Sequence, residues 1–322
     1  MNNSLEEALL KGISPQTQEF YHLYIRHLNG RIFPDKFHEY IQSAYKALKN
    51  RESFKTINKY CTFIGSTRSG HSLIASLIDA HPEMVISDEL NAIRYLKDGF
   101  SQQQHYSLII KLSQINAQEN REMGGYSYGI SNQWQGRFRE LKVIGDKQGP
   151  GATLWLYLNP NLFKSLCTKS KPSSQFIHVI RNPYDTITTL MKKTNLLKKE
   201  SLNLKYPFYR YLNKKTLDLE TTIELYFLLY KAVAGLKEKL NSSKCLDIYY
   251  ESFIENPKDH LIKICNFLEV EHPSDYLKDC ADFVYKSPPK SRHGADWTPK
   301  LIDRVRINME FYPFFSRYSY QN

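Results

Sequence analysis

The sequence predicts an α/β protein in which a central parallel β-sheet is flanked by helices. Short runs rich in β-branched and aromatic residues recur along the chain, and most are followed by a turn and then by apolar residues at helical spacing. Such an alternation is typical of parallel strands joined by helical crossovers. The expected strands are Tyr60–Gly65, Met84–Ser87, Leu141–Gly145, Gln175–Ile180 and Cys245–Tyr250.

Helical spacing of apolar residues follows most of these strands. The expected helices are Ser72–Ala80, Pro183–Leu196, Thr221–Leu240, Lys258–Leu268 and Pro299–Tyr312. In a parallel sheet, ligands bind at the carboxyl ends of the strands, where loops lead into helices. Site residues are therefore expected directly after each strand.

Composition narrows the class of protein. A chain of 322 residues with 41% apolar content can bury a full core. A net charge of +11 favours anionic partners, but no nucleic-acid-binding motif is present. The five cysteines lack CxxC spacing, which favours reduced core residues over a disulfide or zinc frame. No signal peptide or transmembrane stretch stands out, so we expect a cytoplasmic protein.

The stretch FIGSTRSGHSL after the first strand predicts a phosphate-binding loop. Two glycines allow the main chain to approach an anion, and the N–H groups that open the next helix would point at it. The residues expected to bind are Gly65, Arg68, Ser69, Gly70, His71 and Ser72. A nucleotide triphosphatase would need Lys in place of His71 and a carboxylate for Mg²⁺, so the loop favours another anion. On its own, it is also compatible with a plain turn between strand and helix.

A second candidate loop, RNPYD, follows the strand Gln175–Ile180. Pro183 has a suitable torsion angle for the start of a helix, and Asp185 suits the positive end of that helix. Thr189 lies four residues further on and is expected to face the same way as Asp185. Arg181 is then placed at the end of the strand.

Together these stretches resemble the sulfotransferases that use 3′-phosphoadenosine 5′-phosphosulfate (PAPS). FIGSTRSGHSLIASLIDAHPEMVISDEL resembles the family's loop for the 5′-phosphosulfate, with His71 and Ser72 in place of two threonines. RNPYDTITT resembles the motif for the 3′-phosphate, which implies contacts from Arg181 and Thr189. The resemblance spans about residues 60–312. It implies a P-loop NTPase-like sulfotransferase domain over residues 56–322, after a helical N-terminal extension over residues 1–55.

Three further stretches are similar to parts of the same family. YYESFIENPKDHLIKICNFLEV implies that Tyr250 lies near the adenine, and SRHGADW implies that Arg292 and Gly294 lie on the 3′-phosphate. LKVIGDKQGP resembles a segment with a lysine at the end of a strand, which implies that Lys147 assists the leaving group together with Arg68. With these cations in place, the resemblance implies no metal.

The candidate base is Glu89. It lies 21 residues after Arg68, a separation similar to that in tyrosylprotein sulfotransferases, which implies that Glu89 takes the proton of the acceptor. A pKa raised by burial would suit this role, and Arg68 would oppose that rise. Asp88 is expected to point elsewhere if the strand alternation continues. His105 is the rival base by its position, and His178 is interpreted as a satisfied core residue.

The resemblance implies transfer of a sulfuryl group to a hydroxyl of a peptide, a carbohydrate or a small molecule. Two alternatives stay open. A P-loop kinase or triphosphatase would turn over nucleotide with Mg²⁺, and an inactive nucleotide- or glycan-binding module would bind the donor without transfer. The sequence chooses neither the acceptor nor the oligomeric state, and a homo-oligomer stays open.

Overall fold

A computed structural model describes residues 2–30, 36–122, 125–168, 171–200, 216–285 and 287–322. The strands are β1 (Lys59–Ile64), β2 (Met84–Asp88), β3 (Val143–Lys147), β4 (Ser173–Ile180) and β5 (Cys245–Tyr249). The helices in the first half are α1 (Asn3–Leu10), α2 (Pro15–Gly30), α3 (Lys36–Lys49), α4 (His71–Asp79), α5 (Ala92–Lys97), α6 (Gln102–Gln118), α7 (Pro150–Leu158) and α8 (Pro160–Thr168). Those in the second half are α9 (Pro183–Glu200), α11 (Leu219–Lys237), α12 (Tyr250–Glu255), α13 (Pro257–Leu268), α14 (Ser274–Phe283) and α15 (Pro299–Met309).

The five strands form one parallel sheet in the order β2-β3-β1-β4-β5. The chain places β2 and β3 on one side of β1 and then β4 and β5 on the other. The loops that follow β1 and β4 therefore leave neighbouring strand ends at the point where the winding direction reverses. Open α/β sheets bind their ligands at this point.

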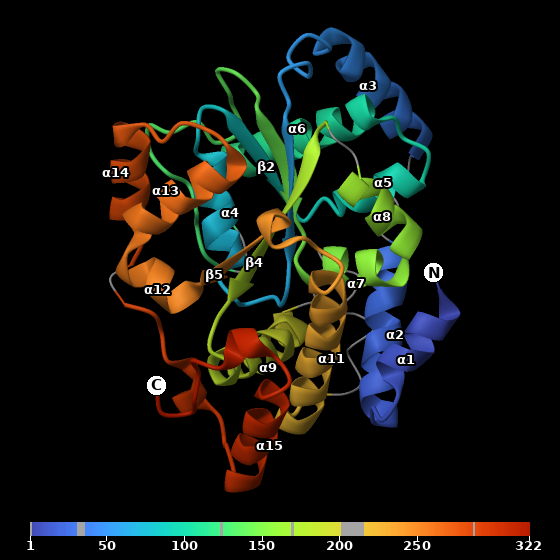
Figure 1. Ribbon diagram of the computed structural model, residues 1–322, viewed down its shortest axis with the longest axis vertical. Coiled ribbons are helices and arrows are strands. Elements are labelled where there is room, and N and C mark those ends of the chain that lie inside the picture. The colour runs from blue at the N-terminus through green and yellow to red at the C-terminus, as the bar shows by residue number, and fades with distance from the viewer. Residues whose placement is uncertain (1, 31–35, 123–124, 169–170, 201–215, 286) are drawn as a thin grey trace.

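Helices cover both faces of the sheet (Figure 1). α4, α12, α13 and α14 pack on one face, and α7, α8, α9, α11 and α15 pack on the other. Each face of the sheet carries its own hydrophobic core. Successive residues of β1 point to opposite faces, so that Phe63 is buried in the core under α4 and Ile64 in the core under α7. The buried sheet explains why its strands are apolar on both faces.

The expected fold class is confirmed, and each expected strand has a counterpart within two residues at either end. The expected helix Ser72–Ala80 corresponds to α4, and Pro183–Leu196 corresponds to α9. No helix of the described residues is long and apolar enough to cross a membrane. All five cysteines are free, and Cys61, Cys265 and Cys280 are buried. The cytoplasmic location stays a prediction.

The N-terminal helices are continuous with the core of the sheet domain. Leu9 of α1 and Tyr21 of α2 pack against Trp155 of α7 and Leu229 of α11. α3 lies at another edge of the molecule, where it packs on α6. The division of the chain at residue 55 stays a prediction.

Candidate functional site

The first loop, residues 65–70, connects β1 to α4 through left-handed backbone. The torsion angle φ is 109° at Gly65, 65° at Arg68 and 97° at Gly70. Arg68 and Ser72 are half-buried, so both side chains reach the surface of the loop. Ser69 is buried, and its hydroxyl donates to the carbonyl of Ser66 at 2.9 Å. Ser69 therefore supports the shape of the loop in this conformation.

Gly70 could not be replaced without disturbing its neighbour. A Cβ atom at this position would overlap the ring of Tyr250, which begins α12 directly after β5. Gly70 is also the N-cap of α4, so its small size brings the Tyr250 ring against the start of the helix. Because Gly70 has no side chain, the first loop can pack directly against Tyr250, the residue that the resemblance places near the adenine.

His71 is the residue at which the loop departs from the nucleotide-binding pattern, and it is 5% exposed. Burial, with a smaller contribution from the charge of Lys147, lowers its pKa to about 3. Its ring lies close to Gly149, because a Cβ added there would be 2.8 Å from the His71 Cε1 atom. Its Nδ1 atom is buried without a hydrogen-bond partner among the described residues. His71 is therefore a neutral imidazole at physiological pH.

The second loop meets the first through Arg181, at the end of β4. The Arg181 Nη1 atom donates to the carbonyl oxygen of Arg68 at 3.1 Å. Its Nη2 atom donates to the carbonyl of Pro289 at 2.8 Å and to the Ser291 hydroxyl at 3.2 Å. Its guanidinium carbon lies 5.3 Å from the centre of the Tyr250 ring. The two loops predicted to bind anions are therefore in direct contact.

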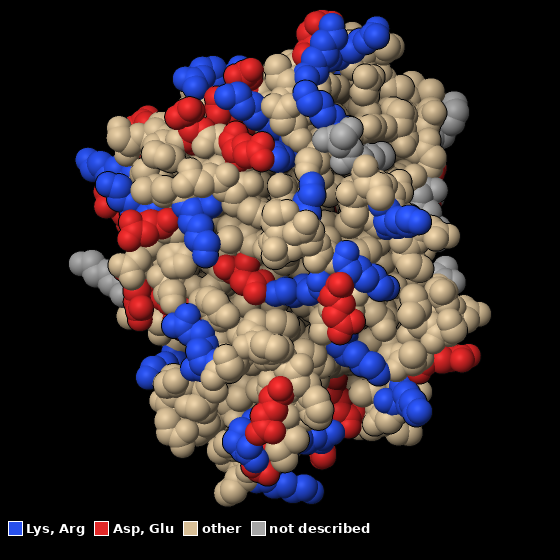
Figure 2. Space-filling model, viewed as in Figure 1, with Lys and Arg blue, Asp and Glu red and all other residues tan. Residues whose placement is uncertain are grey.

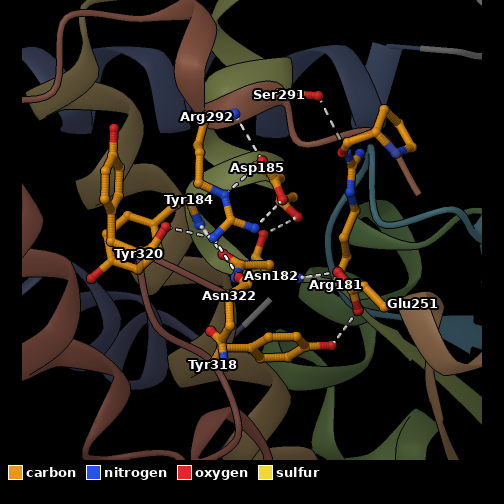
Figure 3. Close-up of polar contacts among 12 residues, drawn as sticks. Arg181, Asn182, Tyr184, Asp185, Glu251, Ser291, Arg292, Tyr318, Tyr320 and Asn322 are labelled. Carbon is orange, nitrogen blue, oxygen red and sulfur yellow. Dashed lines mark hydrogen bonds and ion pairs between the residues drawn. The ribbon is translucent and has the colours of Figure 1, made fainter. Parts of the chain in front are cut away.

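Arg292 lies behind this loop and is 2% exposed. Its Nη2 atom forms an ion pair with Asp185 at 2.6 Å, and its Nη1 atom donates to carbonyls of the C-terminal segment, including those of Ser319 and Tyr320 (Figure 3). These contacts use most of the hydrogen-bond donors of Arg292. Its role as a phosphate ligand stays a prediction. Thr189 lies half-buried on α9, the helix that also carries Asp185, and its hydroxyl donates to the Asp185 carbonyl at 2.8 Å.

Gly294 is exposed at the end of the short helix η4 (Ser291–Gly294). A Cβ atom at this position would overlap the ammonium group of Lys192, on α9. Gly294 thus lies close to α9, the helix that carries Thr189, and its contact with the 3′-phosphate stays a prediction.

Lys147 is completely buried at the end of β3 and is held by two carboxylates. Its Nζ atom contacts the Asp88 Oδ1 atom and lies 3.2 Å from the Glu89 Oε1 atom. Burial alone would lower the pKa of Lys147, but the charges of Asp88 and Glu89 outweigh it and raise that pKa. The ammonium is therefore charged at neutral pH, and the Glu89 side chain, 33% exposed, is the member of the group open to solvent.

The expectation for Asp88 was wrong, since its carboxylate points at the same ammonium as that of Glu89. The strand alternation ends at Glu89, where φ is 59°. The left-handed turn swings the Glu89 side chain back toward Lys147, while the Glu89 N–H donates to the Lys147 carbonyl at 2.9 Å. Alternation of side chains applies only while the backbone stays extended.

The rival base His105 and the expected core residue His178 have other neighbours. His105 is buried, 3.3 Å from the hydroxyl of Tyr60, and Tyr60 lies near the amino end of β1. His178 lies within β4, and its Nδ1 atom is 3.1 Å from the Asp247 Oδ1 atom. Its Nε2 atom has no partner among the described residues, so only one of its two ring nitrogens is satisfied as expected. Burial lowers the pKa of His178.

An open parallel α/β sheet with a glycine-containing loop between its central strand and a helix is an arrangement typical of phosphate-binding proteins. The model of the sulfotransferase family matches residues 62–274, which include both loops and the Lys147 group. The chain therefore belongs to the sulfotransferase family.

Solved structures with a similar fold were also found. A sulfotransferase from Mycobacterium avium, STF9, is 12% identical, with a TM-score of 0.46 and coverage of 98% of this chain and 90% of that one. A sulfotransferase from Alicyclobacillus acidocaldarius is 14% identical, with a TM-score of 0.41 and coverage of 81% and 91%. Mouse SULT7A1, solved in complex with PAP, is 15% identical, with a TM-score of 0.39 and coverage of 80% and 74%. No curated protein matched the sequence.

Proposed function

We propose that this protein transfers a sulfuryl group from PAPS to a hydroxyl group of an acceptor. The observation that supports this most directly is the 3.1 Å contact between Arg181 and the Arg68 carbonyl. PAPS carries anionic groups at both its 3′ and 5′ positions, so its site needs two phosphate loops close enough to be spanned by one nucleotide. A kinase site would need one such loop and a metal-binding carboxylate.

A buried polar atom at the second loop fits an anionic ligand. The Arg181 Nε atom is buried without a partner among the described residues. An unsatisfied buried donor costs about 1–3 kcal/mol unless something binds it. We assign the 5′ end of the donor to residues 65–72, the 3′-phosphate to Arg181 and Thr189, and the adenine to the neighbourhood of Tyr250.

The chemistry follows from the charges of the site. When bound, PAPS supplies the sulfuryl group, whose bond to the 5′-phosphate oxygen breaks as a bond to the acceptor oxygen forms. Arg68 and the N–H groups of the first loop would stabilise the negative charge on the leaving phosphate. The Lys147 ammonium has three N–H donors, of which Asp88 and Glu89 take two. We propose that its remaining donor serves the leaving oxygen and that Glu89 accepts the acceptor proton.

Calorimetry with 3′-phosphoadenosine 5′-phosphate (PAP), compared with ATP and Mg²⁺, tests the donor. We expect PAP to bind more tightly than ATP. Arg68→Ala removes a charged donor worth about 1.5–3 kcal/mol, so we expect about 10- to 100-fold weaker PAP binding. Tighter binding of ATP, or magnesium-dependent turnover of ATP, would contradict the proposal in favour of a kinase.

Two matched glycine variants test the geometry of the loop. Gly70→Ala combines a positive φ with overlap on Tyr250, whereas Gly99→Ala has a similar φ of 85° and open space around the new atom. We expect PAP binding to be lost in the first variant and kept in the second.

Turnover is tested with ³⁵S-labelled PAPS and a panel of phenols, saccharides and tyrosine peptides. We expect transfer to at least one class and a fall of about 10²- to 10⁴-fold in Glu89→Gln, with PAP affinity unchanged. Binding of PAP with no transfer to any acceptor would favour an inactive binding module.

A further inference from the structure

The turn that carries Glu89 is strained at two positions. Glu89 and Asn91 both have φ of 59°, although neither is glycine. Backbone of this kind costs about 1–3 kcal/mol per residue and persists only where surrounding contacts hold it. β2 ends at Asp88 and α5 begins at Ala92, so the turn has no regular structure of its own. Some other part of the molecule must therefore hold it.

Asp146 supplies that support from the neighbouring strand. Its Oδ1 atom accepts hydrogen bonds from the Ser87 hydroxyl at 2.7 Å and from the Leu90 N–H at 3.1 Å. Its Oδ2 atom accepts one from the Ala92 N–H at 3.0 Å. The carboxylate is buried, with 4% of the residue exposed. Its donors lie before and after Glu89, so the carboxylate spans the turn.

The position of Asp146 in the sheet explains this arrangement. In the parallel register, Ser87 lies opposite Asp146 and Asp88 lies opposite Lys147. Lys147 binds the side chains of Asp88 and Glu89, and its carbonyl accepts the Glu89 N–H. Two consecutive residues of β3 therefore make different contacts with this segment. Lys147 binds the carboxylates of Asp88 and Glu89, and Asp146 binds the backbone on both sides of Glu89.

We propose that Asp146 is a positioning residue for sulfuryl transfer, which holds the Glu89 turn so that the Glu89 carboxylate stays beside Lys147. The role of Glu89 rests on the proposed function, whereas the support of the turn by Asp146 does not. A carboxylate suits the position because all of its described partners are donors. An amide there would present an NH₂ group to at least one N–H or hydroxyl.

Asp146→Asn tests this role with little change in volume. In a crystal structure of the variant, we expect the Glu89 turn to leave its left-handed conformation and the Glu89 carboxylate to move away from Lys147. We expect the rate of PAP release from PAPS, with water or a panel acceptor as the nucleophile, to fall at least tenfold. PAP affinity should stay within about twofold of the wild-type value, because Arg68 and Arg181 do not depend on the turn.

Asp79→Asn is the matched control. Asp79 is another buried aspartate, which accepts hydrogen bonds from the Ile86 N–H and the Ser113 hydroxyl and forms an ion pair with Arg121, and none of these three partners belongs to the Glu89 turn. We expect this variant to lose stability with the turn unchanged. Should Asp146→Asn fail to fold, Ser87→Ala removes one of the three bonds, and we expect a smaller effect of the same kind.

An unchanged turn in Asp146→Asn, or in Ser87→Ala if only that variant folds, would overturn the proposal. A loss of PAP affinity equal to the loss of rate would also overturn it, because it would indicate general damage to the site. If the wild-type protein does not bind PAP, the proposed function fails, but the crystallographic comparison still tests the support of the turn.

Discussion

His71 is the residue at which this chain departs from the phosphate-loop pattern of nucleotide triphosphatases. Where nucleotide triphosphatases have a lysine, this chain has a buried imidazole whose pKa burial lowers to about 3. A cation at this position would add to the charge of Arg68 and of Lys147. The neutral ring instead leaves the positive charge of the site to those two residues, while the backbone N–H at position 71 is kept.

The lowered pKa of His71 predicts a contribution to the pH dependence of stability. Between about pH 3 and pH 6.5, the unfolded chain binds a proton at this residue and the folded chain does not, so stability falls as the pH is lowered through this window. The slope is at most about 1.4 kcal/mol per pH unit. We expect His71→Gln to lose this slope, as measured by urea unfolding at a series of pH values.

Other buried groups do not disturb the comparison. The pKa of Asp146 is raised by burial to about 6, which makes a contribution of opposite sign, but this group is present in both proteins and cancels in their difference. NMR of labelled histidine should show the His71 ring neutral at pH 5. Equal pH slopes for the wild-type protein and His71→Gln would contradict a neutral buried ring.

At the scale of single residues, the sequence predicted identities better than conformations. Arg68, Arg181 and Glu89 follow strands and Lys147 ends one, which is where ligand-binding residues of a parallel sheet are expected. The roles of Asp88 and Asp146 could not be predicted, because they depend on the positive φ of Glu89, and nothing at Glu89 itself marks a left-handed residue. Asn91 was the one local signal, since asparagine tolerates that conformation more readily than most residues.

At the scale of elements, the start of α9 is held by the C-terminal segment (Figure 3). The Asn182 side chain donates to the carbonyl of Ser319 at 2.9 Å. Glu251 accepts from the Asn182 N–H at 2.9 Å and from the Tyr318 hydroxyl at 2.6 Å. Together with the pair formed by Asp185 and Arg292, these contacts fix the loop on which Arg181 stands.

The buried pair between Asp185 and Arg292 predicts strong coupling. Removing one partner leaves the other charge buried and unpaired, which costs about 3–5 kcal/mol. We expect Arg292→Met and Asp185→Asn each to destabilise by that order, and the double variant to lose little more than either one. The measurement is a double-mutant cycle on the free energy of unfolding.

The same variants separate two roles for Arg292. If it acts by holding α9, Arg292→Met and Asp185→Asn should weaken PAP binding equally, and this is the result we expect. A much larger loss of PAP affinity in Arg292→Met would instead identify Arg292 as a direct ligand of the 3′-phosphate, and would count against a purely positioning role.

Strand and helix patterns predicted the sheet well because its strands are buried on both faces and end in clear turns. Helices outside that alternation were harder. α6 buries Leu108 and Ile109 but also Gln104, His105 and Ser107, so its buried face is not marked by apolar residues. α7 begins at Pro150 and is apolar nearly throughout, which gives no periodic signal.

At the scale of the whole molecule, the net charge of +11 says little about a partner. On the face shown in Figure 2, Lys and Arg side chains are interspersed with Asp and Glu and do not gather in one patch. The cations that matter for the proposed donor are partly or fully withdrawn from the surface. Arg181 is 6% exposed and Lys147 is fully buried. The proposed function therefore depends on a few enclosed charges.

The N-terminal extension is tied to the sheet domain by polar contacts as well as by packing. Glu224 of α11 accepts hydrogen bonds from the hydroxyls of Ser14 and Thr17, and its other oxygen pairs with Arg304 of α15 at 2.8 Å. One carboxylate therefore joins the extension, α11 and α15. Removal of the extension would leave this carboxylate with fewer donors and would expose the apolar surface of α7 and α11.

We therefore predict that residues 56–322 alone are not stably folded. Leu154, Leu158 and Leu228 would lose the cover of α1 and α2, so the fragment should self-associate on size-exclusion chromatography with light scattering. In the full chain, Leu9→Ala should cost about 2–5 kcal/mol of unfolding free energy, whereas Glu7→Ala, on the exposed side of α1, should cost almost nothing. A monomeric fragment with the thermal stability of the full chain would instead show that the extension is a separate unit, because burial of these leucines would then contribute nothing to the fold.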